Sequence, residues 1–246
     1  MTTDIIYRYK NQVYFNITNK CPCRCTFCIR NTEDAIGEAS NLWFEHEPAL
    51  EEIYKAIDEF DFSDCNEVVF CGYGEPTMAL ENLIAVSKYI RERYPFRIRL
   101  NTNGLSDLIH KRSTAEEICQ AVDSISISLN MPDAASYNEV VRPAYGEKSF
   151  DAMLKFARDC KQYLDDVRFT VVDVIGEEKV EQSKILAAQN GILIILKNHH
   201  RQVFRYPDSI SLYHIHELVH KAADNTNCCW TVCRIKQFIE QQLDIG

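Results

Sequence analysis

Four cysteines lie within eight positions near the start of the chain, at Cys21, Cys23, Cys25 and Cys28. Thiols grouped this closely can form a redox pair, bind a structural zinc ion or ligate an iron–sulfur cluster. A structural zinc site usually takes its four ligands from two separated pairs, and no second pair follows this group at the usual distance. A redox C-x-x-C motif would leave Cys21 and Cys23 unexplained.

The spacing favours a cluster with three ligands. Without Cys23, the residues Cys21, Cys25 and Cys28 read C-x3-C-x2-C, with the aromatic Phe27 before the last cysteine. Three thiolates can hold three corners of a 4Fe–4S cube and leave the fourth iron open to a chelating molecule. Cys23 then has no ligand role. The spacing alone leaves zinc binding and unligated thiols as the alternatives.

Short β-rich runs alternate with amphipathic helical stretches around and after the cysteines. The β-rich runs predict strands at 12–18, 67–73, 96–102, 124–130, 167–174 and 192–196. Helical periodicity predicts helices at 47–60, 79–94, 114–122, 149–164 and 177–189. Such repetition indicates βαβ units around a parallel sheet, so we expect an α/β fold, a partial (β/α)6 barrel. The cysteines follow its first strand, where barrels of this type place their chemistry.

The composition limits the class of protein. The chain has 246 residues, eleven cysteines and a net charge of −9. A chain this acidic has no global attraction for nucleic-acid phosphates. It contains no apolar run of about 18 residues and no apolar signal segment at its start, so we expect a cytoplasmic protein with no membrane contact. Its cysteines are then expected to be mostly reduced.

Three later segments and the cysteine motif together resemble the signature of radical S-adenosylmethionine (radical SAM) enzymes. "FCGYGEPT" (70–77) is similar to the Gly-Gly-Glu-Pro motif of that superfamily, with Tyr73 in the place of the first glycine. "LNTNG" (100–104) and "SISISLN" (124–130) lie at the ends of the next two predicted strands. Each segment alone is a weak signal, but their order and their places agree with one fold.

The resemblance covers about residues 10 to 190 and is closest to the TatD family-associated radical SAM proteins. "NITNKCPCRCTFCIRN", "FCGYGEPT" and "RLNTNG" carry it. A looser similarity exists to 7-carboxy-7-deazaguanine synthase and to the activating enzymes of glycyl-radical enzymes. The fold that this resemblance implies is a partial (β/α)6 barrel of the radical SAM type.

The resemblance also implies roles for individual residues. Cys21, Cys25 and Cys28 would ligate the 4Fe–4S cluster, and S-adenosylmethionine would bind its open iron. The residues expected to contact S-adenosylmethionine are Tyr73, Gly74, Glu75, Asn101, Asn103, Ser128 and Asn130. The first three would pair with the methionine amine, the next two would bind the ribose, and the last two would reach the ribose or the carboxylate. The resemblance assigns no catalytic residue.

The implied activity is reductive cleavage of S-adenosylmethionine to a 5′-deoxyadenosyl radical, which abstracts hydrogen from an unidentified substrate. The net reaction could be that of an oxidoreductase, a lyase or a transferase. The alternative is a non-catalytic iron–sulfur protein that transfers electrons on the same core. Expected partners are a one-electron donor such as flavodoxin or ferredoxin and a TatD-like metal-dependent hydrolase.

The domain organisation is expected to be a core at 10–197 followed by a C-terminal helical extension of uncertain role at 198–246. Adjacent side chains diverge in a helix or a strand, so we expect the extension to bind no metal of its own. Its candidate ligands are His216, His220, Cys228, Cys229 and Cys233. The isolated cysteines of the core are expected to be small buried hydrophobic residues. They are Cys65, Cys71, Cys119 and Cys160.

Overall fold

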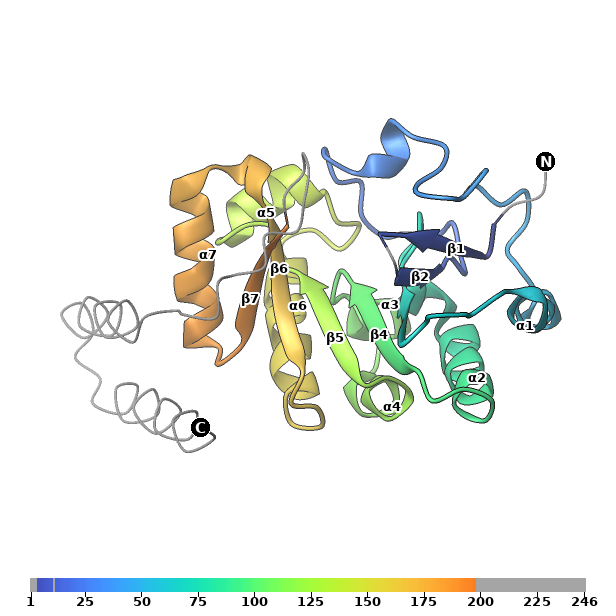
Figure 1. Cartoon of the computed structure of the whole chain (residues 1–246). Helices are drawn as coiled ribbons and strands as arrows, with labels where there is room; N and C mark the ends of the chain where they lie inside the picture. Colours follow the sequence, from blue (N-terminus) through green and yellow to red (C-terminus); the bar gives the residue numbers. More distant parts are fainter. Residues whose placement is uncertain (1–3, 11, 198–246) are drawn as a thin grey trace. The chain divides into compact units, whose positions relative to one another are not determined.

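The computed structural model describes residues 4–10 and 12–197, which contain one seven-stranded sheet. Its strands follow one another in chain order: β1 (Ile6–Tyr9), β2 (Gln12–Phe15), β3 (Glu67–Phe70), β4 (Arg97–Thr102), β5 (Ser124–Ser128), β6 (Val167–Val172) and β7 (Leu193–Lys197). The strands β2 to β7 are all parallel, whereas β1 pairs with β2 in the antiparallel sense. Because β1 and β7 are separate edges, the sheet is an open partial barrel, and the predicted fold class is confirmed (Figure 1).

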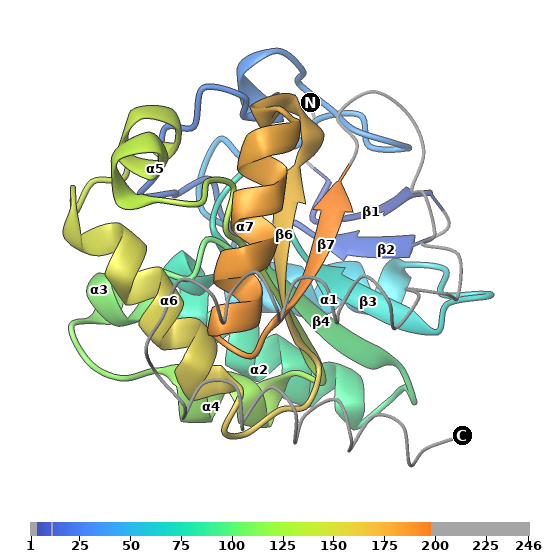
Figure 2. The ribbon, with the colours of Figure 1, turned by 90° about the vertical axis from the view of Figure 1, so that its left-hand side faces the viewer.

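The helices of this part of the chain connect the parallel strands. They are α1 (Leu50–Glu59), α2 (Leu80–Arg91), α3 (Ser106–His110), α4 (Ala115–Ala121), α5 (Ala134–Val141), α6 (Lys148–Cys160) and α7 (Glu177–Gln189). Single turns of 3-10 helix occur at Ile29–Asn31, Pro76–Ala79 and Asp173–Ile175. The helices α2, α4, α6 and α7 lie on one face of the sheet, as Figures 1 and 2 show from two directions.

The alternation of side chains along the strands gives the two faces of the sheet different chemistry. Ile98 and Leu100 of β4 are fully buried and belong to the same hydrophobic core as Leu83 of α2. Successive residues of a strand point to opposite faces, so Arg99 and Asn101 lie on the other face. The sheet is therefore apolar towards its helices and polar on its inner face.

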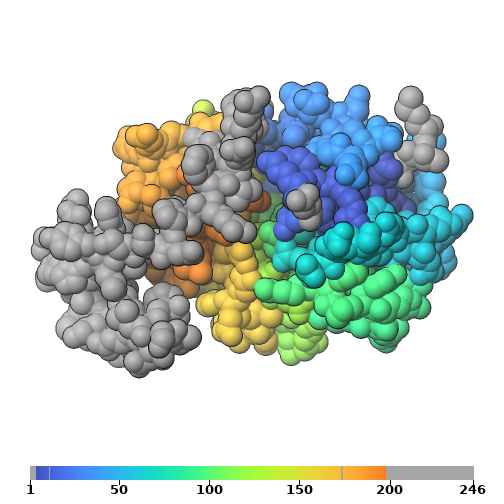
Figure 3. All heavy atoms as spheres, viewed as in Figure 1, coloured from blue at the N-terminus to red at the C-terminus, as the bar shows by residue number. Residues whose placement is uncertain are grey.

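The segment between β2 and α1, residues 16–49, contains the cysteines. It lies beside β1 and β2, at the end of the sheet towards which the arrowheads of β4, β5 and β6 point, and it is blue in Figures 1 and 3. The helix α5, which follows β5, lies at the same end of the sheet. The fold therefore brings the loops that follow the parallel strands to one edge.

The internal contacts divide the chain into two compact units, residues 1–199 and residues 200–246. The predicted C-terminal extension, with His216, His220, Cys228, Cys229 and Cys233, lies outside the described residues. None of the helices described here is both long enough and apolar enough to cross a lipid bilayer.

Candidate cofactor site

The cysteine loop, residues 19–31, is held in place by the end of α5. The backbone N–H of Arg24 donates a hydrogen bond to the carbonyl of Val141 at 3.1 Å, and that of Thr26 donates to the carbonyl of Val140 at 2.9 Å. These bonds satisfy carbonyl groups at the end of a helix, which have no partner within the helix itself. A loop with little regular structure thus gains fixed backbone positions around its thiols.

The four thiols of this loop have different surroundings. Cys23 is buried, with 4% of its surface exposed, whereas Cys21, Cys25 and Cys28 are half-buried. The backbone N–H of Cys23 donates to Sγ of Cys21 at 3.5 Å, and Nδ2 of Asn103 donates to Sγ of Cys23 at 3.6 Å. The three residues with the C-x3-C-x2-C spacing are therefore the more accessible ones.

The pKa values of the thiols also separate Cys23 from two of its neighbours. Hydrogen bonding with Cys23 lowers the pKa of Cys21 and of Cys25, and the positive charge of Arg30 lowers both further. Hydrogen bonds with Cys21 and Cys25 raise the pKa of Cys23, and burial raises the pKa of Cys28. Iron binds thiolates, so the chemistry of Cys21 and Cys25 suits ligation better than that of Cys23.

Arg30 connects the cysteine loop to the loop that follows β3. Its guanidinium donates to the carbonyls of Asn19 at 3.5 Å, Tyr73 at 3.2 Å and Cys23 at 3.3 Å. It also lies over the ring of Trp43, 6.0 Å from the ring centroid. A single side chain therefore bonds two points of the cysteine loop and joins this loop to the loop after β3, and sequence reasoning did not identify it.

The loop after β3, residues 71–77, packs backbone against backbone on the cysteine loop. A Cβ atom on Gly74 would lie 2.1 Å from the carbonyl oxygen of Thr18, and the N–H of Glu75 donates to the carbonyl of Lys20 at 2.8 Å. The side chain of Tyr73 is buried against Leu42 and contacts the edge of Trp43, with ring centroids 5.0 Å apart. At this position only the backbone of Tyr73 can serve a cofactor, because its ring packs under residues 32–49.

Glu75 has a buried carboxylate whose two oxygens accept hydrogen bonds from Thr77, Thr102 and Asn103. Oε1 accepts from Thr102 Oγ1 at 2.6 Å and from the N–H and hydroxyl of Thr77, and Oε2 accepts from the N–H of Asn103 at 2.7 Å. Burial raises the pKa of this carboxyl group, and these hydrogen bonds oppose the effect. Glu75 thus joins the loops that follow β3 and β4, a role that the sequence motif did not reveal.

We expect Glu75→Gln to lower the free energy of unfolding by about 2–3 kcal/mol, because the new amide must place an NH2 group against one of two backbone N–H donors. Urea unfolding monitored by circular dichroism measures this change. Glu81→Gln, at an exposed position of α2, is the control and should change stability by less than about 0.5 kcal/mol. Equal effects of the two substitutions would contradict a structural role for the carboxylate.

The other predicted residues lie along the ends of β4 and β5. Asn101 pairs in register with Ser126, and Ser128 lies one step further along the same face. Asn101 Oδ1 is buried and has no hydrogen-bond partner among the residues described, so it could accept a hydrogen bond from a bound molecule. Asn103 uses its side chain internally, since its Oδ1 accepts from the N–H of Leu105 at 2.9 Å. Asn130 is buried and adopts a left-handed backbone conformation directly after the strand.

A hollow of about 500 Å³ opens beside the cysteines. Its lining residues are Arg24, Cys25, Thr26, Cys28, Arg30, Asn31 and Arg142. Within the structure as described, none of these three arginines forms an ion pair with a carboxylate. The hollow therefore combines two candidate iron ligands with positive charge. Arg142 lies far from the cysteines in sequence, at the end of a helix that was not predicted, and no motif pointed to it.

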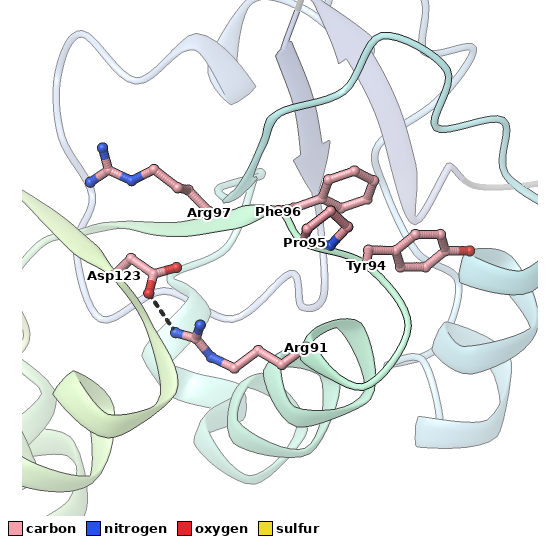
Figure 4. Close-up of a pocket in the computed structure, with 6 residues that line it drawn as sticks. All are labelled: Arg91, Tyr94, Pro95, Phe96, Arg97 and Asp123. Atoms are coloured by element: carbon pink, nitrogen blue, oxygen red, sulfur yellow. Dashed lines mark hydrogen bonds and ion pairs between the residues drawn. The ribbon is translucent and has the colours of Figure 1, made fainter.

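A second hollow, of about 410 Å³, lies at the opposite end of the sheet (Figure 4). It includes Arg97 at the start of β4 and Asp123 just before β5. Arg91 and Asp123 form an ion pair there at 2.9 Å, which the dashed line in the figure marks. None of the residues predicted from sequence to bind a cofactor lines this hollow, so it is not the candidate site.

The donor set fits a 4Fe–4S cluster. Three half-buried cysteines share one loop, and two of them have a lowered pKa that favours the thiolate. No three His, Cys, Asp or Glu side chains in residues 4–10 and 12–197 meet as ligands of a single metal ion would. The thiolates of a cube bind three different iron atoms and need not meet at one point.

Comparison with known protein families identifies the family of the chain. The model of the Radical SAM superfamily matches residues 15–186, which is more than half of the sequence. The chain therefore belongs to the Radical SAM superfamily. This is a superfamily of enzymes that use a 4Fe–4S cluster and S-adenosylmethionine, and both predicted cofactors are thereby confirmed.

Two curated relatives are dual-specificity RNA methyltransferases named RlmN. The one from Wigglesworthia glossinidia brevipalpis is 24% identical over 132 residues, which cover 49% of this chain and 32% of that protein. The one from Halorhodospira halophila is 24% identical over 126 residues. This chain thus matches only about a third of the length of these relatives.

Solved structures share the fold at low identity. A radical SAM methyltransferase from Sphaerobacter thermophilus has a TM-score of 0.57 and 15% identity, over 87% of this chain and 64% of the other. SuiB of Streptococcus suis, bound to S-adenosylmethionine, has a TM-score of 0.50 and 16% identity, over 86% of this chain and 43% of SuiB. These similarities support the partial barrel.

Proposed function

We propose that this protein is a radical SAM enzyme whose 4Fe–4S cluster is held by Cys21, Cys25 and Cys28. When reduced, the bound cluster supplies the electron that cleaves S-adenosylmethionine to a 5′-deoxyadenosyl radical, which abstracts hydrogen from the substrate. The observation that carries this proposal is the cysteine loop, whose thiols lie in the loop after the first parallel strand. The loops after β3 and β4 are bonded directly to it.

The chain's own residues would bind and orient S-adenosylmethionine around that loop. The backbone of Tyr73 and Gly74 is the candidate partner of the methionine amine. Asn101 is the candidate for the ribose because its Oδ1 has no hydrogen-bond partner among the described residues, whereas the side chain of Asn103 is already engaged. Ser128 and Asn130, at the end of β5, complete the polar edge.

Arg142 extends this set of candidate residues. It is exposed, lines the same hollow as Cys25 and Cys28, and has no carboxylate partner among the residues described. A guanidinium group can bind a carboxylate with two parallel hydrogen bonds. We therefore assign Arg142 to the carboxylate of S-adenosylmethionine.

Anaerobic assay of the reconstituted, dithionite-reduced protein tests this function. We expect the EPR spectrum of the reduced cluster to change shape when S-adenosylmethionine is added, and 5′-deoxyadenosine to form. Arg142→Gln should weaken binding of S-adenosylmethionine about tenfold, because a charge-assisted hydrogen bond contributes about 1.5 kcal/mol or more. Arg24→Gln is the control, because it removes a second exposed arginine from the same hollow; its binding should stay within about twofold of the unmodified protein if the two parallel hydrogen bonds to the carboxylate are made by Arg142 alone.

The outcomes separate the two functions that the sequence allows. A spectrum indifferent to S-adenosylmethionine, with no 5′-deoxyadenosine formed, would support the non-catalytic electron-transfer protein instead. If Arg24→Gln and Arg142→Gln weaken the binding of S-adenosylmethionine equally, the result would contradict a specific role of Arg142.

The finer features predicted from the sequence belong to the same proposal. They are a place in the TatD family-associated branch, a flavodoxin or ferredoxin as electron donor, a TatD-like hydrolase as partner and a cytoplasmic location. The extra Cys23 within the cysteine motif supports the branch. Comparison of metabolites and tRNA nucleosides between a wild-type strain and a Cys25→Ala strain would identify the substrate.

A further inference from the structure

We propose that Arg30 is a positioning residue that also makes the cluster easier to reduce. It fixes the cysteine loop on the loop after β3, and its positive charge lies beside the thiolates with no carboxylate paired to it among the described residues. The inference rests on the proposed function, because it takes Cys21, Cys25 and Cys28 as the ligands.

The contacts of Arg30 explain how the charge is held in place. Its three hydrogen bonds, at 3.2 to 3.5 Å, all go to backbone carbonyls, including that of Cys23 between two of the ligands. A carbonyl is a dipole and leaves the full charge of the guanidinium in place. The side chain also lies over Trp43 and is only partly exposed, so water screens its charge less than that of a surface arginine.

Arg30 shares the lack of a carboxylate partner in the described part of the chain with Arg24 and Arg142 of the same hollow, whereas several arginines elsewhere have one. Arg91, Arg97 and Arg99 form ion pairs at 2.9 to 3.1 Å, and Arg168 pairs with Asp166. The whole chain carries a net charge of −9, so carboxylates are abundant. Arg30 nevertheless has none within ion-pair distance in the residues described, although it lines the same hollow as Cys25 and Cys28.

The expected consequence is a higher reduction potential. A one-electron reductant adds one negative charge to the cluster and leaves its thiolate bonds unchanged. A fixed positive charge nearby stabilises the more negative, reduced form more than the oxidised form. The net charge around an iron–sulfur cluster and the hydrogen bonds to its sulfurs are known determinants of its potential.

The test is an EPR-monitored redox titration of reconstituted variants. For Arg30→Gln we expect the ratio of reduced to oxidised cluster at a fixed potential to fall about tenfold, which corresponds to 59 mV for a one-electron couple. Arg30→Lys retains the charge and should stay within about threefold. Arg24→Gln removes an exposed charge from the same hollow and should stay within about twofold.

The design also separates a structural role from an electrostatic one. If Arg30→Gln does not retain about four iron atoms per chain, Arg30→Met serves as the second uncharged variant, because its stem still packs over Trp43. The inference would be overturned if the midpoint potential of the cluster were unchanged in the uncharged variant, or if Arg30→Lys shifted that potential as much as the uncharged variant does. Absence of the cluster from the unmodified protein would instead refute the proposed function.

Discussion

Replacement of Cys21, Cys25 or Cys28 by alanine is expected to abolish the 4Fe–4S cluster, whereas Cys23→Ala should leave it largely intact. Each ligand holds a different iron of the cube, so two thiolates cannot replace three. The reconstituted unmodified protein should be brown and contain about four iron atoms per chain. Iron analysis and the visible absorption of the four single variants measure the difference.

Cys23→Ala is the matched control for this prediction, since it removes a thiol from the same loop. Cys23 is the buried member of the group, its thiol accepts a hydrogen bond from Asn103, and its pKa is raised. Its loss should cost packing and one weak hydrogen bond, with an effect on stability of about 1–2 kcal/mol. Loss of iron from Cys23→Ala together with retention of iron in Cys21→Ala would show that the ligands are assigned wrongly.

The parallel strands could be predicted from the sequence because each is a short β-rich run between turn residues or helices. All six predicted runs, from 12–18 to 192–196, overlap strands of the sheet, although β7 extends one residue beyond the last run. The antiparallel β1 was not predicted, because its residues IYRY do not alternate regularly between apolar and polar side chains and its pairing with β2 is a tertiary contact. The helix α3 was not predicted because five residues show too little periodicity, and α5 was not predicted because it buries only Tyr137 and Val141.

The candidate site could be predicted only where a local motif marks it. The spacing of the cysteines indicated iron ligation, but Arg30 and Arg142 come to lie beside the cysteines only through the tertiary structure. Tyr73 is a second example. The sequence shows that it stands in the place of a glycine of the motif, but it does not show that the Tyr73 ring packs under residues 32–49.

The sequence motif and the structure give different reasons why residue 74 must be a glycine. The motif indicates that a glycine allows the backbone to approach the cofactor closely. In the structure, the space that a Cβ atom would need is taken by the chain itself, because the Cβ would lie 2.1 Å from the carbonyl oxygen of Thr18 and 2.8 Å from that of Lys20. Both neighbours are backbone atoms just before Cys21. They cannot move as a side chain can.

We therefore expect Gly74→Ala to lower the free energy of unfolding by about 3 kcal/mol, a typical cost of overpacking, and to reduce iron per chain to less than half. The loop that precedes Cys21 must move to admit the methyl group, and the first ligand moves with it. Thermal or urea unfolding of the apoprotein measures the first effect, and iron analysis after reconstitution measures the second.

Gly146→Ala is the control, because a Cβ atom there meets no other atom within 4 Å. Its left-handed backbone makes the substitution cost about 1 kcal/mol, but it should leave the iron content unchanged. If Gly74→Ala retains iron and stability but binds S-adenosylmethionine weakly, the glycine serves the cofactor and not the packing of the two loops. If Gly74→Ala loses iron in the absence of S-adenosylmethionine, the contact with Thr18 is what requires glycine. The motif at residues 70–77 then positions the cysteine ligands of the cluster as well as S-adenosylmethionine.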